Sequence, residues 1–363
     1  MDLKQQNVLF FTRTMYLGGT ENVVLQLCEI FKPLVNKIVV CSCGGVNIKR
    51  LDAMEIKHYE IPDIEKKSPI IILKTTNILK RIVIDENITI IHTHHRMAAF
   101  YVSLLQLYKR CTFINTSHNT FKSKKLLTRF SYKHAHLIAC GEMVKRNLTE
   151  FFDLPYQQVT VIHNAVKQFN ETVKIDPTIK DLHDNGYFVV GNVGRLSEQK
   201  GMEYFIQAIP MIIEKCHNSR FLIIGSGEDE AKLRQLSNDL KVNKYLIFMG
   251  YRNDIQNIMS QLDLVVLSSL WEGLPLTPIE AFSVGKTIVA TAVDGTKEIV
   301  NDNKNGFLIK EKKPESIAEK VLFLLNNFEV KKEFELEAYQ TFKSEYSFES
   351  FSQKLLEYYY TLK

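Results

Sequence analysis

The chain has 363 residues, of which 45% are hydrophobic and 24% charged, so it is long enough for two domains of an ordinary soluble globular protein. Its polar beginning and the short apolar run at 8–11 predict no secretory signal, and no apolar stretch is long enough to span a bilayer. Six scattered cysteines without a C-x-x-C pair favour reduced thiols and a cytoplasmic location.

The net charge of +5 is unevenly distributed along the chain. Residues 1–170 contain 23 Lys and Arg against 13 Asp and Glu, a net charge of +10, and the remainder has 23 against 28, a net charge of −5. One domain is therefore expected to face an anionic partner. No aromatic-basic motif accompanies the charge, so nucleic acid is weakly supported and we expect none. A membrane surface or a lipid diphosphate acceptor fits the charge equally well.

Short apolar runs alternate with longer amphipathic segments, which is typical of strand–helix units in a parallel sheet. In the first half this pattern predicts strands at 7–11, 37–41, 88–92, 112–116, 136–139 and 159–162, and helices at 20–31, 69–81 and 98–108. A polar stretch at 169–186 is expected to be a linker. Further strands are then predicted at 187–192, 221–224, 245–249, 263–267, 287–290 and 306–309, followed by helices from 315 onward.

The predicted fold class is therefore α/β, with two Rossmann-like domains of six strands each at 1–168 and 187–344. Ligands of open parallel sheets bind beyond the carboxyl ends of the strands. With two such sheets facing across a cleft, the residues that follow the strands are the candidates for chemistry.

Two glutamates, Glu272 and Glu280, follow the predicted strand at 263–267 within the sequence WEGLPLTPIE (271–280). A glycine–proline loop and a helix start separate them, and the N-terminus of a helix suits a diphosphate. Flanking carboxylates could accept hydrogen bonds from sugar or ribose hydroxyls. An alternative for Glu280 is a capping box with Thr277, with Pro278 as the first helical residue.

Two cations, Arg195 and Lys200, follow the strand at 187–192 within GRLSEQKG (194–201). At the end of a strand they could clamp a diphosphate and stabilise it as a leaving group. The alternative is a pair of solvated surface charges, which the flanking glycines and the strand-end position disfavour.

Three further strand ends carry weaker signals. The loop LGGTE (17–21) could approach a ligand closely or form a tight turn. His118 ends the strand at 112–116, where a lone histidine is usually structural. The sequence HTHH (92–95) suggests a metal site, but no carboxylate or cysteine cluster accompanies it, so none is expected. The sequence GSG (225–227) lacks the third glycine and downstream acid of a dinucleotide fingerprint.

The segment 271–280 resembles the E-x7-E motif of the family-4 retaining glycosyltransferases, and 194–201 is similar to the G-R-L-x-x-x-K-G loop of the same family. The resemblance runs from about residue 7 to 340 and implies the GT-B fold, with the last helix (about 345–363) packing back on the first domain. It implies that Glu272 contacts the transferred sugar, Glu280 the ribose, and Arg195 and Lys200 the phosphates.

The resemblance extends to weaker positions as well. It assigns the diphosphate to the backbone of Gly273, Leu274, Pro275 and Leu276, and further donor contacts to Gly18, Gly19, Gly225, Gly227, Tyr251 and Arg252. It places His118 opposite the reacting sugar. The catalytic residues that it implies are His118, Arg195, Lys200 and Glu272. Acceptor-side candidates are Glu21, His94 and Asn119, the last standing where the family often has aspartate.

The function implied is transfer of a hexose or N-acetylhexosamine from a nucleotide-sugar, with a UDP-sugar as the expected donor, to a glycan or lipid-linked glycan. Retention of anomeric configuration, no metal, no other cofactor and a setting in surface polysaccharide synthesis are expected. A nucleotide-sugar epimerase of the same fold and a catalytically silent relative are the alternatives.

A stripe of cations lies at 122–133, where Lys122, Lys125, Arg129 and Lys133 would share one helix face beside Leu126 and Phe130. Such a stripe is either a solvated face or a membrane-surface contact. In the second case the protein would lie at the inner face of the membrane.

Overall fold

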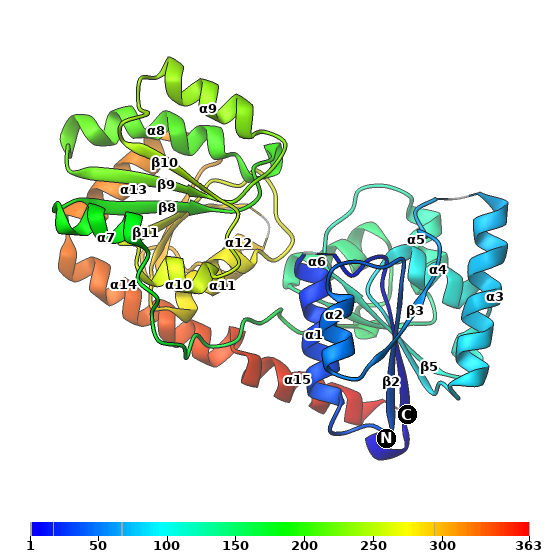
Figure 1. Cartoon of the computed structure of the whole chain (residues 1–363). Coiled ribbons are helices and arrows are strands. Elements are labelled where there is room, and N and C mark those ends of the chain that lie inside the picture. The colour runs from blue at the N-terminus through cyan, green and yellow to red at the C-terminus, as the bar shows by residue number, and fades with distance from the viewer. Residues whose placement is uncertain (1, 17, 67, 294, 363) are drawn as a thin grey trace. The chain divides into compact units, whose positions relative to one another are not determined.

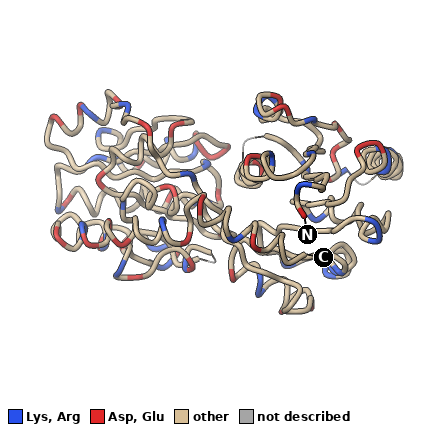
Figure 2. Tube along the Cα trace, turned by 90° about the horizontal axis from the view of Figure 1, so that it is seen from below, with Lys and Arg blue, Asp and Glu red and all other residues tan. Residues whose placement is uncertain are grey.

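The computed structural model describes residues 2–16, 18–66, 68–293 and 295–362, which form two compact units (Figure 1). Unit 1 comprises Met1–Asn164 and Phe351–Lys363, and unit 2 comprises Ala165–Ser350. Each unit is a parallel sheet with helices on its faces, so the predicted α/β class with two Rossmann-like sheets is confirmed. Acidic and basic residues are interleaved along both units (Figure 2).

Unit 1 contains a seven-stranded sheet in the order β3-β2-β1-β4-β5-β6-β7, in which every adjacent pair is parallel. The strands are β1 (Asn7–Phe11), β2 (Lys37–Ser42), β3 (Lys57–Glu60), β4 (Ile90–Thr93), β5 (Thr112–Ser117), β6 (His136–Ala139) and β7 (Val159–Val161). Its helices are α1 (Gly19–Phe31), α2 (Ile48–Ala53), α3 (Pro69–Asp85), α4 (Arg96–Leu104), α5 (Lys125–Tyr132) and α6 (Glu142–Arg146).

Six strands of this sheet were expected, and the seventh, β3, was not. It is an edge strand of four residues, Lys-His-Tyr-Glu, none of them fully buried. An edge strand packs fewer neighbours and needs no apolar run, so hydrophobic patterning does not reveal it.

Unit 2 contains a six-stranded parallel sheet in the order β10-β9-β8-β11-β12-β13. The strands are β8 (Phe188–Val193), β9 (Ser219–Ile224), β10 (Leu246–Gly250), β11 (Leu264–Leu267), β12 (Ile288–Thr291) and β13 (Gly306–Ile309). Its helices are α7 (Pro177–Asp184), α8 (Met202–Lys215), α9 (Glu230–Asp239), α10 (Ile255–Ser260), α11 (Leu276–Ser283), α12 (Thr296–Ile299), α13 (Pro314–Asn326) and α14 (Phe328–Thr341).

The stretch expected to be a linker, 169–186, contains helix α7. Asp176 caps this helix by accepting hydrogen bonds from the backbone N–H groups of Thr178 and Ile179 at 3.0 and 3.3 Å. Ile179 and Leu182 are buried in unit 2. The linker prediction is wrong for this segment, because Asp-Pro is a helix start there rather than a break.

Helix α15 (Phe348–Thr361) follows, and from Phe351 onward it belongs to unit 1. Its buried residue Tyr359 packs on Phe31 with ring centroids 4.4 Å apart, and its hydroxyl lies 2.7 Å from Nδ1 of His92. The end of the chain is thus tied to the centre of the first sheet.

The two sheets share one topology. In each, the first strand (β1 or β8) pairs on one side with the second strand of its unit and on the other with the fourth (β4 or β11). The direction of winding reverses between these two strands. The crevice at the carboxyl ends of such a pair is where doubly wound sheets bind ligands.

Candidate active site

The reversal point of unit 2 brings Lys200 and Glu272 together. Lys200 lies in a short helical turn after β8, and Glu272 lies in the loop after β11. The lysine Nζ is 2.6 Å from the carboxylate Oε1, and the two side chains are only 17% and 6% exposed. Ser269 Oγ donates to the same oxygen at 2.6 Å, and Gln199 Nε2 lies 3.4 Å from Oε2. A buried carboxylate is therefore held between one cation and two neutral donors.

Glycines allow the loops around this pair to pack backbone against backbone. A Cβ on Gly225 would lie 1.9 Å from the carbonyl oxygen of Gly194, and one on Gly227 would lie 2.2 Å from that of Leu196. Gly201 has a φ of +55°, and a Cβ there would lie 2.3 Å from the oxygen of Ser268. These contacts give Gly225 and Gly227 a structural role in holding the loop after β8, beside their predicted role toward the donor.

The capping-box interpretation of Glu280 is wrong. Helix α11 begins at Leu276 with Pro275 as its N-cap, so Thr277 and Pro278 lie inside the first turn, and no side chain of the described residues caps the helix. The backbone of Gly273, Leu274 and Pro275 leads directly into this uncapped N-terminus. Its first N–H groups have no intrahelical partner, which suits an anion.

Glu280 is therefore available for another role. Burial raises the pKa of its carboxyl to about 7, and the positive charge of Lys200 opposes this shift. A carboxyl whose pKa is raised to near neutrality by burial is typical of a ligand-binding site.

Two other predicted donor residues are engaged in ion pairs. Arg195, 72% exposed, pairs with Glu228 at 3.1 Å. Arg252 donates to both carboxylate oxygens of Asp254 at 2.8 and 2.9 Å and to Asp176 at 3.0 Å. Tyr251 is exposed beside it. The exposed Arg195 pair is weak and easily exchanged, whereas the Arg252 network connects the end of β10 to the start of α7.

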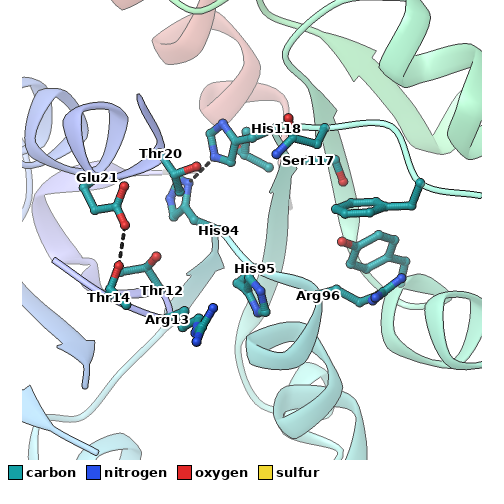
Figure 3. Close-up of a pocket in the computed structure, with 14 residues that line it drawn as sticks. Thr12, Arg13, Thr14, Thr20, Glu21, His94, His95, Arg96, Ser117 and His118 are labelled. Carbon is teal, nitrogen blue, oxygen red and sulfur yellow. Dashed lines mark hydrogen bonds between the residues drawn. The ribbon is translucent and has the colours of Figure 1, made fainter. Parts of the chain in front are cut away.

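The reversal point of unit 1 holds a cavity of about 230 Å³ (Figure 3). Four predicted residues line it, Glu21, His94, His118 and Asn119, together with residues that the sequence did not single out. The lining consists of Thr12, Arg13, Thr14, Thr20, Glu21, His94, His95, Arg96, Thr116, Ser117, His118, Asn119, Phe121 and Tyr132.

Gly18 and Gly19 stand at the start of α1 and do not line this cavity. A Cβ on Gly18 would lie 2.4 Å from Oε2 of Glu21, so the glycine leaves room for that side chain to fold back. The carboxylate of Glu21 there accepts a short hydrogen bond from the Thr14 hydroxyl. Leu17, the first residue of this motif, lies outside the described residues.

His118 is paired with His94 and with no carboxylate. The Nδ1 of His94 lies 3.2 Å from the Nε2 of His118, with the rings stacked at a centroid distance of 5.5 Å. Asn119 is exposed, although it lines the cavity. The tautomer of His118, which the sequence left open because Asn119 replaces an aspartate, is thus governed by a second histidine.

Burial keeps these histidines neutral. It lowers the pKa of His118 to about 4 and that of His94 well below its usual value. His92 lies beside His94 with a ring-centroid distance of 4.3 Å and an interplanar angle of 30°, and burial lowers its pKa to about 3. Its Nε2 lies 2.7 Å from the hydroxyl of Thr116, and its Nδ1 meets Tyr359. A row of neutral imidazoles therefore runs from α15 to the cavity.

Sequence reasoning missed Arg13, Arg96, Gln199 and Ser269. Each of them follows a central strand by a few residues, so the strand-end rule could have indicated them. Within the described ranges, no three His, Cys, Asp or Glu side chains are grouped so that they could hold a metal ion. No helix in the described part of the chain has the length and apolarity needed to cross a bilayer.

Comparisons with known proteins cover both units of the chain. The family models described as Glycosyltransferase Family 4 and Glycosyl transferases group 1 match residues 17–167 and 177–341. A crystal structure of Anabaena HepE in complex with UDP superposes with a TM-score of 0.84 at 20% identity, covering 98% of this chain and 100% of that one.

Curated relatives include the Escherichia coli UDP-Gal:alpha-D-GlcNAc-diphosphoundecaprenol alpha-1,3-galactosyltransferase, 29% identical over 81% of each chain. The Staphylococcus aureus poly(ribitol-phosphate) alpha-N-acetylglucosaminyltransferase is 28% identical over 65% of this chain and 46% of its own length. Several other relatives are also matched over less than two thirds of their length. The chain belongs to the group 1 glycosyltransferases, the family-4 type that its sequence resembles, and is a glycosyltransferase enzyme.

Proposed function

We propose that the protein transfers a hexose or N-acetylhexosamine from a UDP-sugar, with retention of configuration and without a metal, to a hydroxyl of a lipid-linked or polymeric glycan. The observation that carries this proposal is the grouping of Lys200, Glu272 and Glu280 beside the uncapped start of α11. A cation and a helix N-terminus suit a diphosphate, and two carboxylates suit hydroxyl groups.

The chemistry assigned to these groups follows from their charges. Lys200 and Arg195 would bind the diphosphate and stabilise the negative charge that develops as the bond from the sugar C1 to the phosphate oxygen breaks. The acceptor oxygen bonds to C1 on the same face, and its proton passes to the departing phosphate oxygen. Glu272 would accept hydrogen bonds from the transferred sugar, and Glu280 from the ribose.

A UDP-sugar is supported as the donor by the UDP complex of HepE and by the UDP-Gal donor of the E. coli relative. A lipid-linked or polymeric acceptor is supported by the diphosphoundecaprenol and poly(ribitol-phosphate) acceptors that two relatives use. Both acceptors carry phosphate. Synthesis of a surface polysaccharide is the setting that these relatives favour.

The test is a thermal unfolding series with UDP, GDP, ADP and NAD, each with and without a chelator. A ligand at about one hundred times its dissociation constant stabilises a protein by about 2.7 kcal/mol. A UDP-dependent shift that EDTA leaves unchanged is expected. NMR of the product's anomeric proton then distinguishes retention from inversion, and sugar conversion without an acceptor would instead indicate an epimerase. Binding of UDP without any turnover would indicate a silent relative.

We also propose that α5 contacts the inner face of the membrane. Leu126 and Phe130 on this helix are 83% and 46% exposed, and Lys122 and Lys133 flank them. Lys125 and Arg129 both pair with Asp153, at 2.8 and 3.2 Å, which reduces the charge of the stripe. The apolar pair is therefore expected to contribute much of the attachment.

Co-sedimentation with anionic phospholipid vesicles tests this contact. The double substitution Leu126→Glu and Phe130→Glu should abolish sedimentation at moderate salt, whereas Ile84→Glu, an equally apolar and exposed position on α3, should not. Equal loss in both variants would contradict a specific role for α5.

A further inference from the structure

The cavity of unit 1 has a cationic end that the donor chemistry does not use. Arg13 follows β1 and Arg96 is the first residue of α4, and both line the cavity with His95 between them (Figure 3). Glu21, His94 and His118 line it as well. Cationic, anionic and neutral polar side chains therefore all line the cavity.

Arg96 is not satisfied by its protein contacts. Its Nη1 makes only long contacts, 3.4 Å to the carbonyl of Ser123 and 3.3 Å to the hydroxyl of Thr128. Its Nε is buried and has no hydrogen-bond partner among the described residues. A buried guanidinium N–H without a partner is costly, so a ligand that accepts from it would be bound favourably.

The N-terminus of α4 faces the same end of the cavity. The helix has nine residues, and the Nδ1 of His95 accepts the N–H of Met97 at 3.1 Å. The other N–H groups of the first turn have no intrahelical partner and carry the positive end of the helix dipole. The Nε2 of His95 lies 3.3 Å from Glu65, so this imidazole donates outward while it caps the helix.

His94 brings a second buried polar atom to the cavity wall. His94 is only 3% exposed and lines the cavity. Its Nε2 has no hydrogen-bond partner among the described residues. The outer Nδ1 of its neighbour His118 also lacks one. Each neutral ring carries one N–H proton, and one of the two protons lies in the contact between the rings. One outer nitrogen of this pair therefore donates and the other accepts. The pair thus offers one donor and one acceptor to a bound molecule.

Acidic groups also surround this region and limit its charge. Asp63 pairs with Arg13 at 2.9 and 3.0 Å, which uses two of the five N–H groups that an arginine carries. Glu65 faces His95, and Glu21 lies across the cavity. The remaining donors of Arg13 and Arg96, together with the helix start, are the cationic groups that line this cavity.

We propose that Arg96, Arg13 and the first turn of α4 bind a phosphate group of the acceptor, and that Glu21 and the His94–His118 pair contact its neighbouring hydroxyls. This inference rests on the proposed function, because it names the chemical class of the acceptor. The phosphate can belong to a diphosphate-linked lipid or to a phosphodiester of a polymer. Both sources present phosphate oxygens to the same site, and a diphosphate carries more negative charge than a phosphodiester.

The test measures phosphate binding while the donor site is filled. The full chain is saturated with UDP, so that the phosphate site of unit 2 is occupied, and is then titrated with inorganic pyrophosphate or dimethyl phosphate. A further rise of the unfolding midpoint and slower hydrogen exchange at the first turn of α4 are expected. A larger response to pyrophosphate indicates a diphosphate acceptor, and a larger response to dimethyl phosphate indicates a phosphodiester polymer.

Matched variants decide which residues are responsible. Arg96→Gln should weaken binding of the preferred probe by about tenfold or more, since a charge-assisted bidentate contact is lost. Arg13→Gln should weaken it as well and serves if the first variant folds poorly. Arg81→Gln, an exposed arginine on α3, is the control and should leave binding unchanged.

The outcomes separate the two proposals. A normal response to UDP with no response to either phosphate probe, or an equal response in the wild type and Arg96→Gln, would overturn the phosphate site. Absence of any response to UDP would instead overturn the proposed donor.

Discussion

Replacing Lys200 with methionine tests whether the ion pair with Glu272 organises unit 2. Two unit charges 2.6 Å apart attract by about 6 kcal/mol at an effective dielectric constant of about 20. Desolvation offsets part of this attraction, and removing one partner of a buried pair costs about 3–5 kcal/mol. Ser269 and Gln199 still donate to the carboxylate, so we expect a loss of about 3 kcal/mol in the free energy of unfolding.

The single tryptophan provides the assay. Trp271 precedes Glu272, and its carbonyl accepts a hydrogen bond from Gln199 at 3.0 Å, so its fluorescence during urea unfolding reports on unit 2. The double variant Lys200→Met, Glu272→Gln removes both charges and should recover at least about 1 kcal/mol relative to Lys200→Met. Lys232→Met, which breaks an exposed pair with Glu203, is the control and should cost at most about 1 kcal/mol. A cost for Lys200→Met no larger than that of the control would refute the reasoning.

Three other perturbations follow from the site geometry. Binding of ribose hydroxyls to an ionised Glu280, whose pKa is raised to about 7, should release a proton near neutral pH. Calorimetry in two buffers of different ionisation enthalpy should detect this proton, and Glu280→Gln should abolish it. Because the pKa of Glu280 is raised, the folded state holds this proton more tightly than the unfolded state. The protonated carboxyl therefore stabilises the fold fully below about pH 4.5, and this stabilisation is lost as the pH rises through 7. Comparing the unfolding free energies of Glu280→Gln and the wild type over that pH range measures the loss. Tyr359→Phe removes the hydrogen bond to His92 and should lower kcat while leaving UDP affinity unchanged, and an unaltered kcat would show that the histidine row does not position His118. Gly225→Ala should lower the stability of unit 2 by more than about 2 kcal/mol, because the new Cβ would meet a backbone carbonyl. Gly186→Ala, at a positive φ but with open space around it, is the control and should cost about 1 kcal/mol. Thermal unfolding of the two variants compares these losses.

The sequence was most informative where burial and backbone geometry leave few alternatives. Strands β1, β6 and β13 match the predicted ranges, because buried apolar side chains occupy most of their positions. The spacing of glycines and charges also located the loops after β8 and β11. These loops follow the same strands in the structure as in the prediction.

The errors arose where tertiary contacts outweigh local pattern. The Thr277–Glu280 spacing fits a capping box, but the helix starts at Leu276, so its first turn includes both Thr277 and Pro278. The stretch 169–186 was expected to be a linker because it is polar, and this expectation overlooked helix α7, in which Asp176 is the N-cap and Ile179 is buried. The partner of His118 lies 24 residues away on a neighbouring strand end, and no local spacing predicts that contact.

The ion pairs of unit 2 indicate how donor binding is linked to recognition of the sugar. The amine of Lys200 is engaged by Glu272, and Arg195 is engaged by Glu228, so both cations are paired with carboxylates. A diphosphate at the start of α11 competes for Lys200, because it carries more charge than a single carboxylate. As the lysine turns toward the phosphates, Glu272 loses its cation and becomes a better acceptor for sugar hydroxyls. We infer that UDP alone weakens the Lys200–Glu272 contact and that the sugar then replaces the lost hydrogen bond. UDP-sugar should therefore bind more tightly than UDP in the wild type, and this difference should shrink in Glu272→Gln, whose amide oxygen is the weaker acceptor.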